Sequence, residues 1–179
     1  MAMTLRVCVA VLAVLGLAPA APAPAAELNV HLQPLQGLVG KTWRGTLSKP
    51  GAAKVQVDVQ RWDEALNGQA VRIVHSINDG DYGGESLVVW DKERQGLVFT
   101  YFTTADFYTT GTVTMEGGAM VTLEEVKGDA DGITQVKGTT RLTAEGKMHV
   151  KTQYLKKGAW VDGRDTDYEE AKDAVVKFR

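Results

Sequence analysis

Three histidines offer the side chains best suited to acid–base chemistry or metal binding near neutral pH: His31, His75 and His149. No two of them have the spacing of a ligand pair, so we expect no metal site. His75 lies in an alternating run with Ile73 and is expected to point inward. A buried neutral imidazole needs only one hydrogen bond, so the simplest role of His75 is structural. A catalytic base beside an inward tyrosine is the alternative.

The segment Gly40-Lys41-Thr42 matches the last three residues of a phosphate-binding loop motif. Such a loop also needs a glycine five positions before the Gly-Lys pair, a buried strand in front and a helix behind. Leu35 stands where that glycine should be, and the residues from Trp43 onward read as a strand. We therefore expect no nucleotide site here.

Two acidic stretches resemble functional motifs without completing them. Glu124 and Glu125 are adjacent, so on a strand they face opposite sides and cannot act as a carboxylate pair on one wall. The segment 129–132 starts like a calcium loop but lacks the glutamate that would close it. We therefore assign no catalytic residue, no metal ligand and no cofactor. The question of enzymatic activity stays open, and a binding protein is favoured.

Runs of alternating apolar and polar residues extend from Lys41 to Tyr168 and are typical of half-buried strands. Turn signals such as Asn67-Gly68 and Gly117-Gly118 separate these runs. A meander of this kind buries its apolar face and removes its edges by closing on itself. We predict an all-β fold, a closed antiparallel meander β-barrel of about ten strands, which is wide enough to hold a cavity. Residues 27–38 are apolar enough to form a short N-terminal cap segment.

The first 25 residues have the layout of a secretory signal peptide. Arg6 gives a positive start, residues 7–17 are apolar, and Ala23-Pro24-Ala25 offers small residues for cleavage after Ala25. Cleavage would remove Cys8, the only cysteine, which excludes disulfides and cysteine-bound metal. We predict a periplasmic or secreted protein in which residues 26–179 form a single barrel domain.

The charge of the predicted mature chain limits its partners. It carries 19 basic and 22 acidic residues spread along its length. This mildly acidic charge does not favour binding to nucleic acid or to an anionic membrane surface. The apolar run of the signal is too short to span a bilayer comfortably and is followed by prolines, so no stable membrane insertion is expected.

Several segments resemble lipocalin-like barrels of the calycin group. A glycine followed closely by a tryptophan opens the first strand, at Gly40 and Trp43, behind a short apolar cap. The hairpin segments 83–91 and 96–102 are similar to secreted bacterial lipocalin-like proteins of unknown function. The resemblance spans residues 35–168 and departs in having two residues, not one, between Gly40 and Trp43. It implies a structural pair in which Arg164 covers the ring of Trp43.

The same resemblance raises haem binding as an alternative. Some ten-stranded relatives of this barrel bind haem through one histidine late in the chain, where His149 stands. However, His149 alternates with Lys147 and Lys151 and is expected to face solvent.

The leading functional prediction is a barrel whose cavity binds a small hydrophobic or amphipathic molecule. Tyr101 and Tyr154 would line the cavity with their rings and orient a polar group with their hydroxyls. One alternative is a small barrel enzyme that uses His75. Another is a filled barrel that binds a protein through the aromatic rim residues Tyr82, Phe102 and Tyr108, and a homodimer is also possible. The residues predicted to line the cavity are Val57, Ile73, His75, Phe99, Tyr101, Phe107, Val121, Val150 and Tyr154.

Overall fold

A computed structural model describes residues 27–47, 53–128 and 131–179. The predicted signal peptide, residues 1–25, and the first two residues of the calcium-like segment 129–132 lie outside these described residues. The described part contains no helix that is long and apolar enough to cross a membrane.

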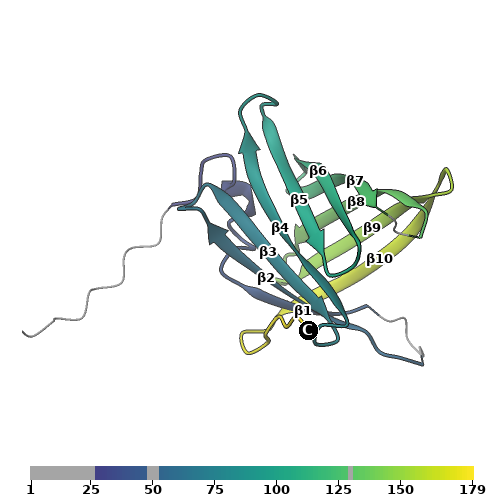
Figure 1. The fold of residues 1–179 in the computed structure, drawn as a ribbon. Coiled ribbons are helices and arrows are strands. Elements are labelled where there is room, and N and C mark those ends of the chain that lie inside the picture. The colour runs from purple at the N-terminus through teal and green to yellow at the C-terminus, as the bar shows by residue number, and fades with distance from the viewer. Residues whose placement is uncertain (1–26, 48–52, 129–130) are drawn as a thin grey trace, which may run out of the picture.

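Ten antiparallel strands form one closed barrel (Figure 1). Each strand pairs with its neighbours in sequence, and β1 also pairs with β10 to close the ring. This confirms the predicted closed meander barrel. The strands are β1 Thr42–Thr46, β2 Val57–Ala65, β3 Ala70–Ile77, β4 Tyr82–Asp91, β5 Gly96–Thr103, β6 Phe107–Glu116, β7 Ala119–Gly128, β8 Ile133–Leu142, β9 Met148–Lys156 and β10 Ala159–Glu170.

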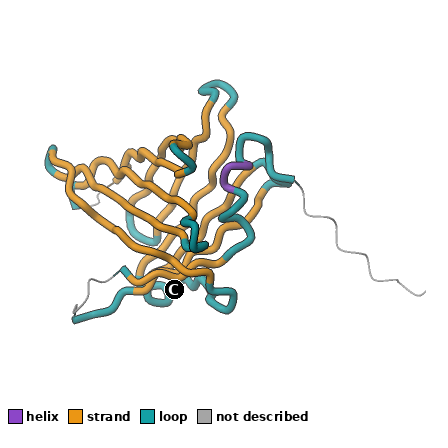
Figure 2. Tube along the Cα trace, turned by 180° about the vertical axis from the view of Figure 1, so that it is seen from behind, coloured by secondary structure: helices purple, strands orange, loops and turns teal. Residues whose placement is uncertain are grey.

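Tight turns connect β2 to β3, β6 to β7 and β9 to β10, as the sequence predicts (Figure 2). Between β6 and β7 the chain reverses at Gly117 and Gly118, whose φ angles are +56° and +79°. A two-residue reversal with both φ angles positive matches the twist of the flanking strands and strongly favours glycine. Between β3 and β4, Asn78 and Asp79 adopt positive φ, which these residue types tolerate better than most.

The N-terminal cap closes one end of the barrel. A short 3-10 helix, η1 (Gln33–Leu35), forms a compact turn before β1. Its neighbours bury four leucines, Leu28, Leu32, Leu35 and Leu38, in the same cluster as the fully buried Trp43. Apolar residues thus seal this end, and the predicted cap segment is confirmed.

The cation beside Trp43 is not the predicted one. The amino group of Lys41 lies 5.4 Å from the centre of the Trp43 ring, and the indole nitrogen donates to the Leu38 carbonyl at 3.4 Å. Arg164 instead bonds to Asp58 deeper in the barrel. Two residues separate Gly40 from Trp43, and the carboxylate of Asp58 is the group that attracts Arg164.

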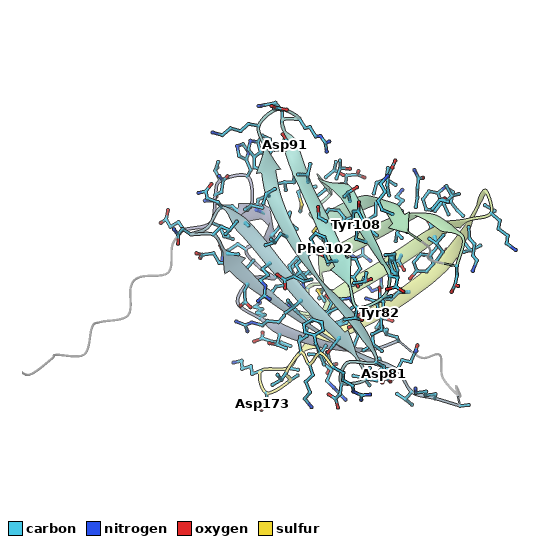
Figure 3. The ribbon with its side chains drawn as sticks, in the orientation of Figure 1. Asp81, Tyr82, Asp91, Phe102, Tyr108 and Asp173 are labelled. Atoms are coloured by element: carbon cyan, nitrogen blue, oxygen red, sulfur yellow. The ribbon has the colours of Figure 1, made fainter. Side chains whose placement is uncertain are left out.

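The last residues of the chain lie against the outside of β3 and the turn that follows it. The backbone nitrogen of Lys177 donates to the Ser76 hydroxyl at 3.1 Å, and Arg179 pairs with Asp81 at 2.9 Å (Figures 1 and 3). Ser76 faces outward, yet it is buried because this segment covers it.

Tyr168 packs on Gly45, its partner across the seam between β1 and β10. A methyl group added at Gly45 would lie 2.7 Å from the fully buried Tyr168 ring. We expect Gly45→Ala to destabilise the barrel by about 1–3 kcal/mol, which is typical of overpacking.

Gly96→Ala is the matched control, since its nearest new neighbour would be 3.8 Å away and its φ angle is ordinary. Urea unfolding followed by circular dichroism measures both variants. Equal stabilities for the two would contradict the packing argument.

Candidate functional site

The barrel encloses a cavity of about 280 Å³ whose walls come from strands β2 to β10. Toward the capped end its walls are apolar, with Val88, Phe99, Val113 and Met120. Most of the polar side chains lie on the other part of the wall, among the apolar Phe107, Val126, Ile133 and Val136. These polar residues are His75, Tyr82, Tyr101, Glu124, Thr152, Tyr154 and Arg164. The cavity is therefore amphipathic.

Most of the predicted lining residues do face this cavity. The structure brings together Ile73, His75, Phe99, Tyr101, Phe107, Val150 and Tyr154. Of the predicted rim residues, Tyr82 lines the cavity, whereas Phe102 and Tyr108 stack on the outside with ring centres 6.0 Å apart (Figure 3).

Val57 and Val121 are exceptions and do not line the cavity. On β2 the inward side chains are Asp58, Gln60 and Trp62, which places Val57 on the opposite face. On β7, Met120 and Thr122 face inward, and Val121 lies on the outer surface with Leu123. Alternation shows that a strand has two faces, but it does not show which face is inside.

Asp58 is the centre of a buried polar network that sequence reasoning missed. Its carboxylate is fully buried and accepts a hydrogen bond from the Tyr168 hydroxyl at 2.8 Å and one from the Gln60 amide at 3.0 Å. It also contacts His75 Nδ1 at 2.9 Å and the Arg164 guanidinium at 3.2 Å. The signal that could have revealed it is the polar face of β2, where an aspartate precedes Gln60 and Trp62 at a spacing of two.

The network keeps Asp58 ionised. Burial alone would raise the pKa of this carboxyl, but its interactions with His75, Arg164 and Gln60 outweigh burial and lower the pKa from 3.8 to about 2. Burial likewise opposes the charge of Arg164, yet the surrounding tyrosines and Asp58 raise its pKa. Asp58 and Arg164 thus form an ion pair in which the carboxylate is fully buried and the guanidinium is partly exposed.

A chain of hydrogen bonds runs from Asp58 into the cavity. His75 Nε2 lies 2.7 Å from the Tyr101 hydroxyl, which lies 3.0 Å from the Tyr82 hydroxyl. The Tyr101 hydroxyl donates to the Tyr82 hydroxyl, and His75 Nδ1 contacts the Asp58 carboxylate. Burial raises the pKa of Tyr101, so its phenol stays protonated at neutral pH. A titratable pair within hydrogen-bonding distance therefore faces the hollow.

Glu124 is a second acid of the cavity, half-buried on the wall formed by β7. The Thr109 hydroxyl donates to one of its oxygens at 2.7 Å. Burial raises the pKa of this carboxyl, and the hydrogen bond from Thr109 lowers it by less. The adjacent Glu125 is exposed and pairs with Lys127, so the two glutamates face opposite sides as predicted.

His75 and His149 both contact other side chains through their ring nitrogens. Both ring nitrogens of His75 are engaged, by Asp58 and Tyr101. His149 lies on the outer surface, where it contacts Asp167 and Asp165. Across residues 27–47, 53–128 and 131–179, no three His, Cys, Asp or Glu side chains come close enough to hold a metal ion.

Comparison of the chain with protein-family models and with curated proteins gives no match.

Low pH should lower the folding stability of the barrel, because Asp58 becomes protonated. Because the folded pKa of about 2 lies below the ordinary 3.8, the stability contributed by this group is complete above pH 3.8 and is lost as the pH falls toward 2. Asp58→Asn should cost about 3–5 kcal/mol at neutral pH, since it leaves Arg164 without its partner. The difference in the free energy of unfolding between wild type and Asp58→Asn should become smaller as the pH falls from 3.8 toward 2, as measured by urea unfolding.

Asp167→Asn is the control, because Asp167 makes a similar contact with His149 on the outer surface. Its cost should be below about 1 kcal/mol. A cost for Asp58→Asn that is small, or that does not change with pH, would contradict this account.

Proposed function

We propose that this protein is an exported lipocalin-like barrel that binds a small hydrophobic or amphipathic molecule in its cavity. The observation that carries the proposal is the hollow of about 280 Å³, apolar toward the cap and polar on the opposite part of the wall. Such a division suits a ligand with an apolar body and a polar group. Export is supported by the pattern of residues 1–25, and lipocalin type by the motifs around Gly40 and Trp43.

The apolar part of the wall would supply most of the affinity. Each Å² of apolar surface removed from water contributes about 25 cal/mol, before the cost of immobilising the ligand. Hydroxyls of Tyr82, Tyr101 and Tyr154 would fix the orientation of the ligand through hydrogen bonds. The cap of buried leucines closes one end, so the ligand would enter through the other.

A second candidate function is proton transfer, which the 2.7 Å contact between His75 and Tyr101 favours. Tyr101 would take a proton from a carbon next to a carbonyl group while passing its own proton to His75 Nε2. The electron pair of the broken C–H bond would remain on the substrate as an enolate. The resulting imidazolium would face the Asp58 carboxylate.

Filling the cavity should abolish binding. Val150 is buried and lines the hollow, so Val150→Phe should weaken binding of the apolar probe N-phenyl-1-naphthylamine by about tenfold or more, as steric exclusion predicts. Fluorescence titration measures the affinity, and native mass spectrometry of protein from its own host identifies any retained ligand.

Val121→Phe places the same added volume on the outer surface, where Val121 lies with Leu123, and should leave probe binding unchanged. Equal binding by wild type and Val150→Phe would show that the probe binds elsewhere.

The proton-transfer candidate is tested with small ketones in D₂O. Mass spectrometry should detect deuterium incorporation next to the carbonyl, and Tyr101→Phe should slow it by about 100-fold. Tyr108→Phe, on the outer surface, should have no effect. Absence of incorporation in the wild type, or an unchanged rate in Tyr101→Phe, would reject this candidate.

A further inference from the structure

Glu124 is the acid inside the cavity whose charge the described protein leaves uncompensated. Its one hydrogen-bond partner in the described residues is the Thr109 hydroxyl, and no cation in that part of the chain lowers its pKa. A half-buried carboxyl without a counter-ion costs folding stability when it ionises. Perturbed acids of this kind in a cleft are typical of functional sites.

The other charges in the barrel already balance one another. Asp58 and Arg164 form an ion pair, and Asp58 also receives hydrogen bonds from Tyr168 and Gln60. Arg164 therefore does not act as the missing counter-ion of Glu124. A positive group supplied by a ligand would provide that counter-ion.

The surroundings of Glu124 suit a cation that carries an apolar body. Phe99, Gly111 and Glu124 are successive cross-strand partners on β5, β6 and β7. Because Gly111 has no side chain, the Phe99 ring lies over its backbone, where an added methyl would be 2.8 Å from the ring. The face of an aromatic ring attracts a cation, so this row offers both a carboxylate and a π surface.

Glu124 also lies at a suitable depth. On the same wall Val126 lies between it and the open end of β7, while Met120 and Val113 lie toward the capped end. A polar head at Glu124 would leave the apolar body of the ligand against the deeper walls, next to Val88 and Phe99.

We propose that Glu124 binds the ammonium group of an amphipathic amine whose apolar body fills the deeper part of the cavity. The proposal rests on the proposed ligand-binding function and names the head group. A carboxylate ligand is less favoured, because its charge would enter a cavity that already holds Glu124, and the Arg164 guanidinium on the wall is already paired with Asp58.

Three ligands with the same eight-carbon tail test the head group: octylammonium, octanol and octanoate. Isothermal titration at neutral pH compares wild type with Glu124→Gln, which keeps the shape of the side chain and an acceptor for Thr109. Wild type should bind octylammonium most tightly. Glu124→Gln should weaken octylammonium binding by about tenfold or more and leave octanol unchanged, since only a contact with the charged form is lost.

Two further variants serve as controls. Glu125→Gln makes the same substitution one residue away on the outer face, where Glu125 pairs with Lys127, and should change none of the affinities. Glu124→Asp retains a carboxylate and should keep the preference for the amine.

The outcomes separate the two proposals. If octanol binds but octylammonium binds no more tightly, or if Glu124→Gln leaves octylammonium binding unchanged, the amine site is wrong and the cavity function stands. Tightest binding of octanoate would also overturn the amine site and assign the head group to Arg164. If none of the three ligands binds the wild type, both proposals fail.

Discussion

The buried carboxylate of Asp58 holds the closing seam of the barrel together. β1 is the shortest strand of the barrel, and its register with β10 covers Trp43, Arg44 and Gly45. Asp58, on β2, bonds across this short strand to Tyr168 and Arg164 on β10 and also contacts His75 on β3. These side-chain contacts thereby add to the few backbone pairs that join β1 to β10.

The same network divides the interior into two environments. On one part of the wall Asp58 contacts Arg164 and His75, and His75 contacts Tyr101. The leucines of the cap pack in an apolar cluster with Trp43 and Phe99 at the other part. Buried polar groups of this kind are tolerated only when their hydrogen bonds are filled, and no buried side-chain nitrogen or oxygen in the described residues lacks a partner. Structural support and the polar wall of the cavity thus come from the same side chains.

Sequence reasoning recovers the fold because alternation and turn residues are local signals. The strand count, the closure and the leucine cap all follow from them. It places Ile73 and Tyr101 inward but misplaces Val57, because a valine-rich face suggests burial, whereas β2 buries its polar face around Asp58. The partner of Arg164 depends on residues about a hundred positions away, and no local pattern encodes such a contact.

The pairing of β1 with β10 also shapes how the chain reaches its native state. Trp43 and Glu170 are register partners at opposite ends of the barrel sequence, so the ring is completed only after all the intervening strands are available. Joining ends so far apart carries a large loop-closure entropy, which makes this a slow, late event in folding. Until it occurs, β1 and β10 each present an unpaired edge, the kind of surface on which neighbouring chains associate. We therefore expect aggregation from chains in which β1 and β10 have not yet paired, and not from the closed barrel.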